Sequence, residues 1–171
     1  MEYLKNKIRS IENFPEEGVI FRDITTLLKD AEGMKTAVDE MAKKLAGIDF
    51  DIVLGPESRG FIFGMPVAYN LGKGFVPVRK KGKLPAEVIS KEYALEYGTA
   101  TIEIHKDAIQ PGMKVVIVDD LLATGGTAKA IAEMVEEMGA EVAAMVFLIE
   151  LDFLNGRQAL PGYKMESVIH Y

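Results

Sequence analysis

The fold of this chain is decided by the stretch VVIVDDLLATGGT, residues 115–127. An apolar run ends in two adjacent carboxylates, and small, hydroxyl and glycine residues follow before a helix begins. Asp119 and Asp120 can accept hydrogen bonds from a vicinal diol, and the loop's backbone N–H groups, aimed by the helix N-terminus, can bind a phosphate. The stretch predicts a sugar-phosphate site at the end of a buried strand. The other interpretation is a polar turn with both acids as solvated caps.

The composition is that of an ordinary globular protein. The 171 residues are 49% hydrophobic and 27% charged, which suits one domain with its own core. A net charge of −6 disfavours a nucleic-acid binder, which needs a basic surface. The chain has no cysteine, no signal-like N-terminus and no apolar run long enough to span a bilayer. We expect a single cytoplasmic domain, residues 1–171, that binds neither nucleic acid nor membrane.

Hydrophobic patterning predicts the strands of a parallel sheet. Strands that are covered on both faces have continuous runs of Val, Ile and Leu. Such runs occupy residues 50–54, 114–118 and 142–149. Residues 75–78 form a shorter run, in which Pro77 favours a position at an edge or at a strand end.

Helical patterns lie between these runs. Asp30 is expected to cap a helix that ends near Leu45. Residues 60–71 are mostly apolar and predict a buried helix, and residues 128–138 carry an amphipathic pattern that Gly139 ends. The alternation of strand and helix predicts an α/β fold with a mostly parallel central sheet flanked by helices.

Two segments depart from this pattern. Apolar and polar residues alternate over Thr99–His105, which predicts a half-exposed strand in an antiparallel flap, about residues 79–105, outside the main sheet. Gly18–Asp23 carries apolar residues without a helical period, within an N-terminal hood of about residues 1–30. This segment is either a loop tucked into the core or a cover whose Phe21 stacks on a flat ligand.

Two further loops follow predicted strands, where ligands bind in open α/β sheets. In the first, residues 55–60, Arg59 offers a planar bidentate donor for a phosphate, although a salt bridge would explain it equally well. The second, Arg79–Lys83, concentrates cations that either form a flexible basic turn or bind a highly charged leaving group. His105 and His170 have no partner pattern and are expected to be structural.

Together these motifs resemble a known family. Residues 116–127 are similar to the phosphoribosyl-pyrophosphate (PRPP) motif of type I phosphoribosyltransferases, and other blocks resemble the adenine phosphoribosyltransferase family in particular. Those blocks are Phe21-Arg22-Asp23-Ile24, Ser58-Arg59-Gly60-Phe61, Val78-Arg79-Lys80, Gly82-Lys83-Leu84-Pro85 and Leu95-Glu96-Tyr97-Gly98. They keep the family's order and spacing over about residues 14–150. Pro56 departs from the family, which more often has an aliphatic or small residue there.

The resemblance implies a fold and an activity. The fold would be that of type I phosphoribosyltransferases, with an antiparallel flap and a small N-terminal hood. The reaction would be purine salvage, in which adenine and PRPP give AMP and pyrophosphate with Mg²⁺. The ion would be held mainly through PRPP and not by a cage of protein ligands, as is usual for Mg²⁺ at phosphates. The partners would be these small molecules and a second copy of the chain in a homodimer.

The resemblance also implies a role for each matched residue. Glu96, on a mobile flap, would be the catalytic acid/base for the purine ring nitrogen. The ribose and 5-phosphate would be bound by Asp119, Asp120, Ala123, Thr124, Gly125, Gly126 and Thr127. Pyrophosphate would be bound by Ser58, Arg59, Arg79, Lys80 and Lys83. Adenine would be bound by Ile20, Phe21 and Arg22.

Two alternatives stay open at this point. A regulatory protein of the same fold could bind PRPP without catalysis, although the chain shows no helix-turn-helix segment and is acidic. A phosphoribosyltransferase for another purine base would share the PRPP motif, because that motif does not identify the base.

Overall fold

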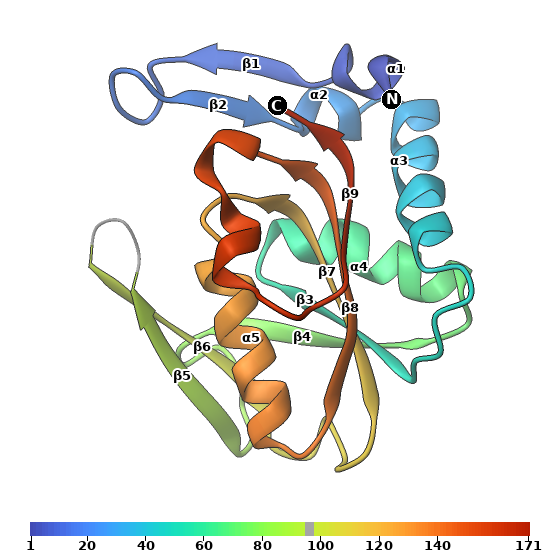
Figure 1. Ribbon diagram of the computed structural model, residues 1–171, viewed down its shortest axis with the longest axis vertical. Coiled ribbons are helices and arrows are strands. Elements are labelled where there is room, and N and C mark those ends of the chain that lie inside the picture. Colours follow the sequence, from blue (N-terminus) through green and yellow to red (C-terminus); the bar gives the residue numbers. More distant parts are fainter. Residues whose placement is uncertain (95–97) are drawn as a thin grey trace.

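The centre of the molecule is a seven-stranded sheet in a computed structural model that describes residues 1–94 and 98–171. Its strands are β3 (Ile52–Pro56), β4 (Gly74–Lys80), β5 (Val88–Ala94), β6 (Thr99–His105), β7 (Lys114–Leu122), β8 (Glu141–Glu150) and β9 (Met165–His170). They lie in the order β5-β6-β4-β3-β7-β8-β9 (Figure 1). Strands β4, β3, β7, β8 and β9 are parallel, which confirms the mostly parallel central sheet.

The antiparallel flap belongs to this sheet. Strand β6 has the predicted bounds and pairs with β5 along its whole length. It also pairs with β4 at Arg79↔Glu103 and Lys80↔Ile102, so the prediction of a flap outside the main sheet is wrong. Over residues 74–78, β4 pairs with β3 alone. Pro77 lacks an N–H group and lies in the part of β4 that has a strand on one side only. This agrees with the expected edge position.

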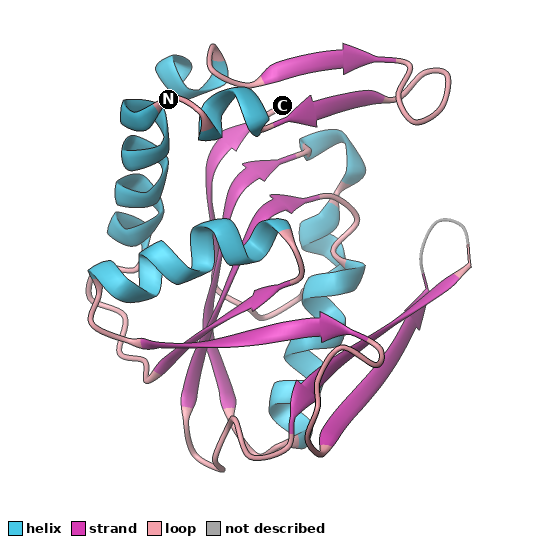
Figure 2. Ribbon diagram, turned by 180° about the vertical axis from the view of Figure 1, so that it is seen from behind, coloured by secondary structure: helices cyan, strands magenta, loops and turns pink. Residues whose placement is uncertain are grey.

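Helices cover both faces of the sheet. The helices are α1 (Glu2–Lys5), α2 (Thr25–Leu28), α3 (Ala31–Lys44), α4 (Arg59–Asn70) and α5 (Gly126–Glu137). The predicted cap of α3 is confirmed, because the Asp30 side chain accepts a hydrogen bond of 2.7 Å from Gly33 N. Gly139, with φ +79°, follows α5 at the predicted stop. Figures 1 and 2 show α5 on one face and α3 and α4 on the other.

Alternate residues of β7 build the two halves of the core. Val116 and Val118 pack in the cluster that includes the buried residues of α3 and α4. Val115 and Ile117 point to the opposite face and pack with the buried residues of α5. A strand between two helical layers needs apolar side chains on both faces, which is why the run in the sequence is unbroken.

The hood is a small sheet of its own. Strands β1 (Arg9–Glu12) and β2 (Ile20–Asp23) pair antiparallel above the C-terminal ends of the central strands (Figure 1). The interpretation of Gly18–Asp23 as a loop tucked into the core is wrong, because Val19 is 43% and Ile20 46% exposed. The conformation of this segment is explained by its pairing with β1 and not by burial. Strand β1 has no apolar pattern of its own.

The end of the chain has structure that the sequence patterns did not predict. Residues after Glu150 form the short 3₁₀ helices η1 (Asp152–Leu154) and η2 (Gly156–Ala159), and then β9 at the sheet edge. Within residues 1–94 and 98–171, no helix is long and apolar enough to cross a membrane.

Candidate active site

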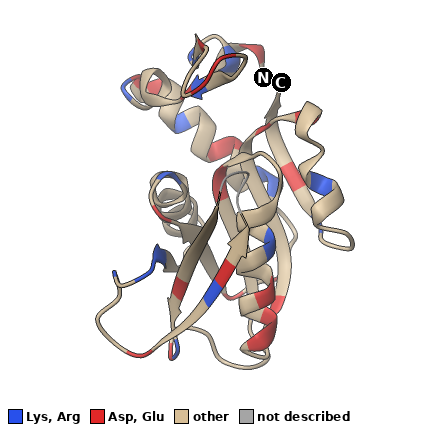
Figure 3. Cartoon of the chain, turned by 90° about the vertical axis from the view of Figure 1, so that its left-hand side faces the viewer, with Lys and Arg blue, Asp and Glu red and all other residues tan. Residues whose placement is uncertain are grey.

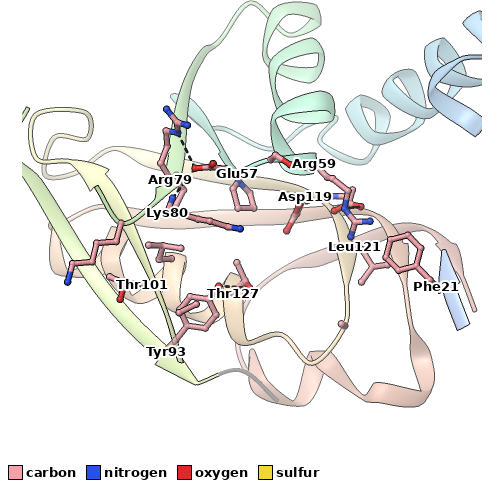
Figure 4. Close-up of a pocket in the computed structure, with 18 residues that line it drawn as sticks. Phe21, Glu57, Arg59, Arg79, Lys80, Tyr93, Thr101, Asp119, Leu121 and Thr127 are labelled. Carbon is pink, nitrogen blue, oxygen red and sulfur yellow. Dashed lines mark hydrogen bonds and ion pairs between the residues drawn. The ribbon is translucent and has the colours of Figure 1, made fainter. Parts of the chain in front are cut away.

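A cavity of about 870 Å³ opens at the point where the strand order of the sheet reverses. The chain passes from β3 to its neighbour β4 and returns to the other side of β3 as β7. Strands β3 and β7 pair only as far as Leu54↔Ile117, and β7 then continues to Leu122. The gap between their carboxyl ends is the usual ligand position in an open α/β sheet. Figure 4 shows labelled lining residues from β4, β5, β6 and β7 around this cavity.

The two adjacent acids lie inside the strand and not after it. Strand β7 runs to Leu122, where the sequence predicted an end at Val118. Asp120 is only 4% exposed, so the interpretation of both acids as solvated caps is wrong. Burial raises the pKa of both carboxyls, and the neighbouring charge of Asp120 raises the pKa of Asp119 further.

Arg59 compensates this buried negative charge. Its Nε lies 3.0 Å from Asp120 Oδ2, so the guanidinium makes the salt bridge that the sequence left as one of two interpretations. The same residue lines the cavity, as does its neighbour Ser58. Arg59 is the first residue of α4, which holds this cation beside the gap between the carboxyl ends of β3 and β7. Pro56 is the last residue of β3 and pairs with Val78.

The glycine-rich loop turns β7 into α5. Gly125 has φ +84°, and a Cβ there would lie 2.6 Å from Gly156 O, so both backbone angle and space require glycine. The turn aims α5 at a smaller cavity of about 110 Å³, which the loop residues line: Ala123, Thr124, Gly125, Gly126 and Thr127. Ala123 and Thr127 also line the main cavity. A helix N-terminus with open backbone amides is a favourable anion site.

A second glycine explains part of the chain end. A Cβ on Gly156 would lie 2.2 Å from Ala123 O, so η2 can support the glycine-rich loop only with glycine at this position. The sequence assigned no role to residues after Glu150, because this contact joins segments far apart in the chain.

Two acids hold the basic turn after β4. Glu57 Oε2 accepts hydrogen bonds from Arg79 Nε at 3.1 Å and from Lys80 N at 3.0 Å. Glu103, which is buried, accepts one from Gly82 N at 2.9 Å. Both acids therefore attach the basic run to neighbouring segments. Arg79 and Lys80 line the cavity, whereas Lys83 is outside its lining and offers its carbonyl oxygen to Arg79 Nη1 at 3.4 Å.

The hood contributes one ring to the cavity. Phe21 lines it, packs edge-on against Phe14 with ring centroids 5.3 Å apart, and has the Arg59 guanidinium 5.6 Å from its centroid (Figure 4). Ile20 and Arg22 are outside the lining. The Arg22 guanidinium instead stacks on Tyr171, 3.7 Å from the ring centroid.

The predicted site residues that line the two cavities come from four separate parts of the chain, whereas Ile20, Arg22 and Lys83 are outside the linings. Only Glu96 cannot be placed, because it lies outside the described residues. The cavity also includes Lys81 of the predicted cation run, and three side chains to which the sequence patterns assigned no role: Glu57, Tyr93 and Thr101. Glu57 precedes Ser58 in the loop of residues 55–60, so its position in the sequence could have indicated a place in the site. Tyr93 gave none, because only the fold of the flap brings β5 to α5.

One group of metal-type ligands lies away from this cavity. Among the described residues, Glu150, Asp152 and His170 are close enough together to hold an ion. The Glu150 carboxylate, however, already accepts hydrogen bonds from Arg157 Nε at 2.7 Å and Nη2 at 2.8 Å. His170 Nδ1 lies 2.9 Å from Asp152 Oδ1. The guanidinium neutralises this group, so it is better explained as a structural ion network than as a metal centre.

The fold and the cavity define a class, the open α/β domains whose ligand site lies at the sheet's switch point. Residues 25–166 match the family model described as the phosphoribosyl transferase domain. The adenine phosphoribosyltransferase of Lachnoclostridium phytofermentans is 60% identical over 171 residues, 100% of this chain and 98% of that protein. The chain belongs to the adenine phosphoribosyltransferase family.

Solved structures agree with this assignment. The adenine phosphoribosyltransferase from Thermoanaerobacter pseudethanolicus superposes with a TM-score of 0.97 at 55% identity, covering 99% of each chain. The Saccharomyces cerevisiae enzyme, crystallised with D-2,5-dideoxy-2,5-imino-altritol 1,6-bisphosphate and adenine, gives a TM-score of 0.91 at 40% identity. That match covers 98% of this chain and 97% of the yeast chain.

Proposed function

We propose that this protein transfers the 5-phosphoribosyl group from PRPP to adenine, giving AMP and pyrophosphate in purine salvage. The observation that carries the proposal is the composition of one cavity. It joins the Asp119–Asp120 pair and Phe21 to Arg59, Arg79 and Lys80, and the glycine-rich loop lines the smaller cavity beside it. An acidic side for a ribose and a basic side for phosphates match the two halves of PRPP.

The sugar half would lie over β7 and α5. The ribose hydroxyls donate hydrogen bonds to the carboxylates of Asp119 and Asp120, and residues 123–127 bind the 5-phosphate through backbone N–H groups. Loss of pyrophosphate leaves positive charge on the sugar, so carboxylates fixed beside the ribose stabilise the transition state. The Arg59–Asp120 ion pair places one cation next to this sugar site.

The pyrophosphate half would lie over β3, β4 and the basic turn. Arg59, Arg79 and Lys80 neutralise the leaving group, with Ser58 as a hydroxyl donor and Lys83 at the border of the turn. Carboxylate oxygens at Asp119 and Asp120 fit a Mg²⁺ ion that is held mostly by substrate phosphates and water. When bound, the ion supplies further positive charge to the phosphates.

The base would enter beneath the hood. Phe21 stacks on adenine, and the backbone groups of Ile20 and Arg22 read its edge. During the reaction the C1–oxygen bond to pyrophosphate breaks and a bond from C1 to the purine nitrogen forms. Glu96 takes the proton that this nitrogen releases. The flap, residues 79–105, excludes water from the sugar cation.

A base panel tests the activity. The protein is incubated with PRPP, Mg²⁺ and adenine, guanine, hypoxanthine, xanthine or orotate, and nucleotide and pyrophosphate are quantified. We expect AMP from adenine and little product from the others. Turnover of another base alone would assign the protein to that base, and PRPP binding without turnover, together with specific retention of DNA or RNA, would favour the regulatory alternative.

A matched pair of variants tests the sugar site. Asp120→Asn removes the charge that pairs with Arg59, and we expect PRPP binding to weaken or the sugar chemistry to slow. Asp107→Asn, in the turn after β6 and outside the lining of both cavities, is the control and should behave as the parent protein. Parent-like kinetics of Asp120→Asn would contradict the diol assignment.

We further propose that the protein works as a homodimer in the cytoplasm. Both expectations rest on the resemblance to the adenine phosphoribosyltransferase family, to which the chain belongs. Sedimentation equilibrium at several protein concentrations tests the dimer, for which a mass near twice 18.8 kDa is expected.

A further inference from the structure

The hydroxyl of Tyr93 lies against the glycine-rich loop although it comes from the flap. Thr127 Oγ1 donates a hydrogen bond of 3.1 Å to Tyr93 Oη, and both residues line the main cavity and the smaller one beside it. Figure 4 shows both side chains pointing into the same space. Strand β5 thereby meets the loop in the first turn of α5, which begins at Gly126.

The ring is held in this place by contacts along α5. A Cβ on Gly126 would lie 3.8 Å from Tyr93 Cδ2 and 3.6 Å from Ala94 O, so the ring packs directly on the loop backbone. Farther along α5, Lys91 Nζ pairs with Glu133 at 3.1 Å and with Glu137. Figure 3 shows the acidic residues gathered on α5 beside the flap. The ion pairs add to the attachment of β5 on the helix, whereas the packing on Gly126 and the bond with Thr127 set the position of the hydroxyl.

The hydroxyl has a proton to donate. A tyrosine hydroxyl is one donor and an acceptor, and Tyr93 already accepts from Thr127. Among the described residues it has no further hydrogen-bond partner, so its own proton is free to point into the cavity. A phosphate bound by residues 123–127 would offer acceptor oxygens beside it. Hydrogen bonds from neutral donors to charged oxygens are the stronger kind.

We propose that Tyr93 is a further ligand of the phosphate that the glycine-rich loop binds. The proposal rests on the proposed function, because it takes the 5-phosphate of a sugar phosphate as the ligand of that loop. Tyr93 donates its hydroxyl proton to a phosphate oxygen while Thr127 orients the hydroxyl from behind. The flap then contributes to the sugar-phosphate end of the site as well as to the side where the base and leaving group react.

The test compares two ligands in one variant. Binding of ribose 5-phosphate and of pyrophosphate is measured by titration calorimetry for the full chain and for Tyr93→Phe, which keeps the ring. We expect the dissociation constant for ribose 5-phosphate to rise about 10-fold to 100-fold, as for one hydrogen bond to a charged group. The constant for pyrophosphate should stay within about 2-fold. An unchanged affinity for ribose 5-phosphate, or an equal loss for both ligands, overturns the proposal.

Two controls separate the hydroxyl from the docking of the flap. Tyr163→Phe removes another hydroxyl that contacts α5, where it donates to Glu136 at 2.6 Å outside the cavity, and should leave both affinities unchanged. Lys91→Met removes the ion pairs to α5 and keeps Tyr93. If it weakens ribose 5-phosphate as much as Tyr93→Phe does, docking and not the hydroxyl explains the effect, which overturns the proposal.

The outcomes also separate this proposal from the proposed function. A parent protein that binds neither ribose 5-phosphate nor pyrophosphate contradicts both. A parent protein that binds both ligands and makes AMP, with a Tyr93→Phe variant of equal affinity, contradicts the role of Tyr93 alone.

Discussion

Two antiparallel hairpins border the cavity, and they are attached to the molecule in different ways. The hood, β1–β2, is a separate two-stranded sheet, whereas the flap, β5–β6, continues the seven-stranded sheet (Figure 1). An isolated two-stranded hairpin is at best marginally stable in water. The hood therefore depends on contacts outside its own ladder, and the flap has a backbone connection at its base.

Side chains make the contacts of the hood. Arg22 stacks on Tyr171, whose backbone N–H donates to Glu150 O at the end of β8. Asp23, at the end of β2, accepts hydrogen bonds from Arg9 and from Thr25 N. Lys7 pairs with Asp30 at 2.6 Å. Each of these contacts involves at least one side chain, so a single substitution can remove it.

The flap is held by backbone at one end and by side chains farther along. Register with β4 joins its base to the sheet, and Lys91 and Tyr93 dock β5 on α5. The hood side of the cavity, where we propose that adenine binds, is therefore held by contacts that single substitutions can remove, whereas the base of the flap is built into the sheet. The following predictions test this difference.

The largest effect is expected at Glu96, the acid/base that we propose, which is outside the described residues. Glu96→Gln keeps the shape and removes the proton acceptor, so kcat should fall about 10²-fold to 10⁴-fold. PRPP affinity should change little. Glu92→Gln, on β5, is the control, and steady-state kinetics with adenine provide the measurement. An unchanged kcat would remove Glu96 from acid/base chemistry.

A smaller effect is expected at Tyr171, which supports the hood through Arg22. Tyr171→Ala removes the stacked ring, and a loss of about 1–2 kcal/mol corresponds to a rise of about 10-fold in KM for adenine. KM for PRPP should stay near the parent value. Tyr171→Phe should behave as the parent, because the Tyr171 hydroxyl is buried and has no hydrogen-bond partner in the described part of the chain. Equal changes in both KM values would contradict a hood-specific role.

The attachment of the hood should also depend on pH. Hydrogen bonds from Thr25 and then Arg9 lower the pKa of Asp23 to about 2, below the ordinary value of 3.8. A carboxyl whose pKa is lower in the folded state stabilises the protein above pH 4, and this stabilisation is lost as the pH falls toward 2. Asp23→Asn should cost about 2 kcal/mol at pH 7 and flatten the stability profile between pH 4 and 2.

Denaturant unfolding at several pH values measures this effect. Asp51→Asn, on the loop before β3, serves as a control for the general effect of removing one acid. A parent-like profile for Asp23→Asn between pH 4 and 2 would show that the carboxyl does not titrate with folding.

The smallest effect is expected at Lys91. Its pairs with Glu133 and Glu137 are partly exposed, and such pairs contribute less than about 1 kcal/mol. Lys91→Met should lower the free energy of unfolding by that amount at most and leave the turnover of adenine within about 2-fold. The difference from the parent should shrink further in 1 M salt. A loss above 2 kcal/mol would mean that docking on α5, and not the ladder with β4, holds the flap.

Much of the fold could be predicted from the sequence because its signals are local. The unbroken apolar runs of β3, β7 and β8 follow from burial between two helical layers, and Asp30 and Gly139 mark helix ends by their own backbone chemistry. The strands β1, β5 and β9 could not be predicted. The residues of β1 and β5 are exposed or half exposed, only the short segment 167–169 of β9 is buried, and all three strands depend on a neighbouring strand from elsewhere in the chain.

The candidate site divides in the same way. The motif around Asp119 and the cations at Arg59 and Arg79 can be recognised locally. Adjacent like charges and clustered glycines are unusual in a short segment and indicate a ligand or a special turn there. Glu57, Tyr93 and Tyr171 were not singled out, since each has an ordinary sequence context. Their importance lies in contacts with Arg79, Thr127 and Arg22.

The sequence by itself determined the alternation of strand and helix, the sugar-phosphate motif of residues 115–127 and the family. Tertiary structure alone decided that the flap joins the main sheet and that β7 carries its acids beyond the last pair with β3. It alone decided that Tyr93 meets Thr127 and that Tyr171 supports Arg22. The physical reason is range: periodicity and caps act within a few residues, whereas strand register and side-chain docking depend on which distant segments the fold brings together.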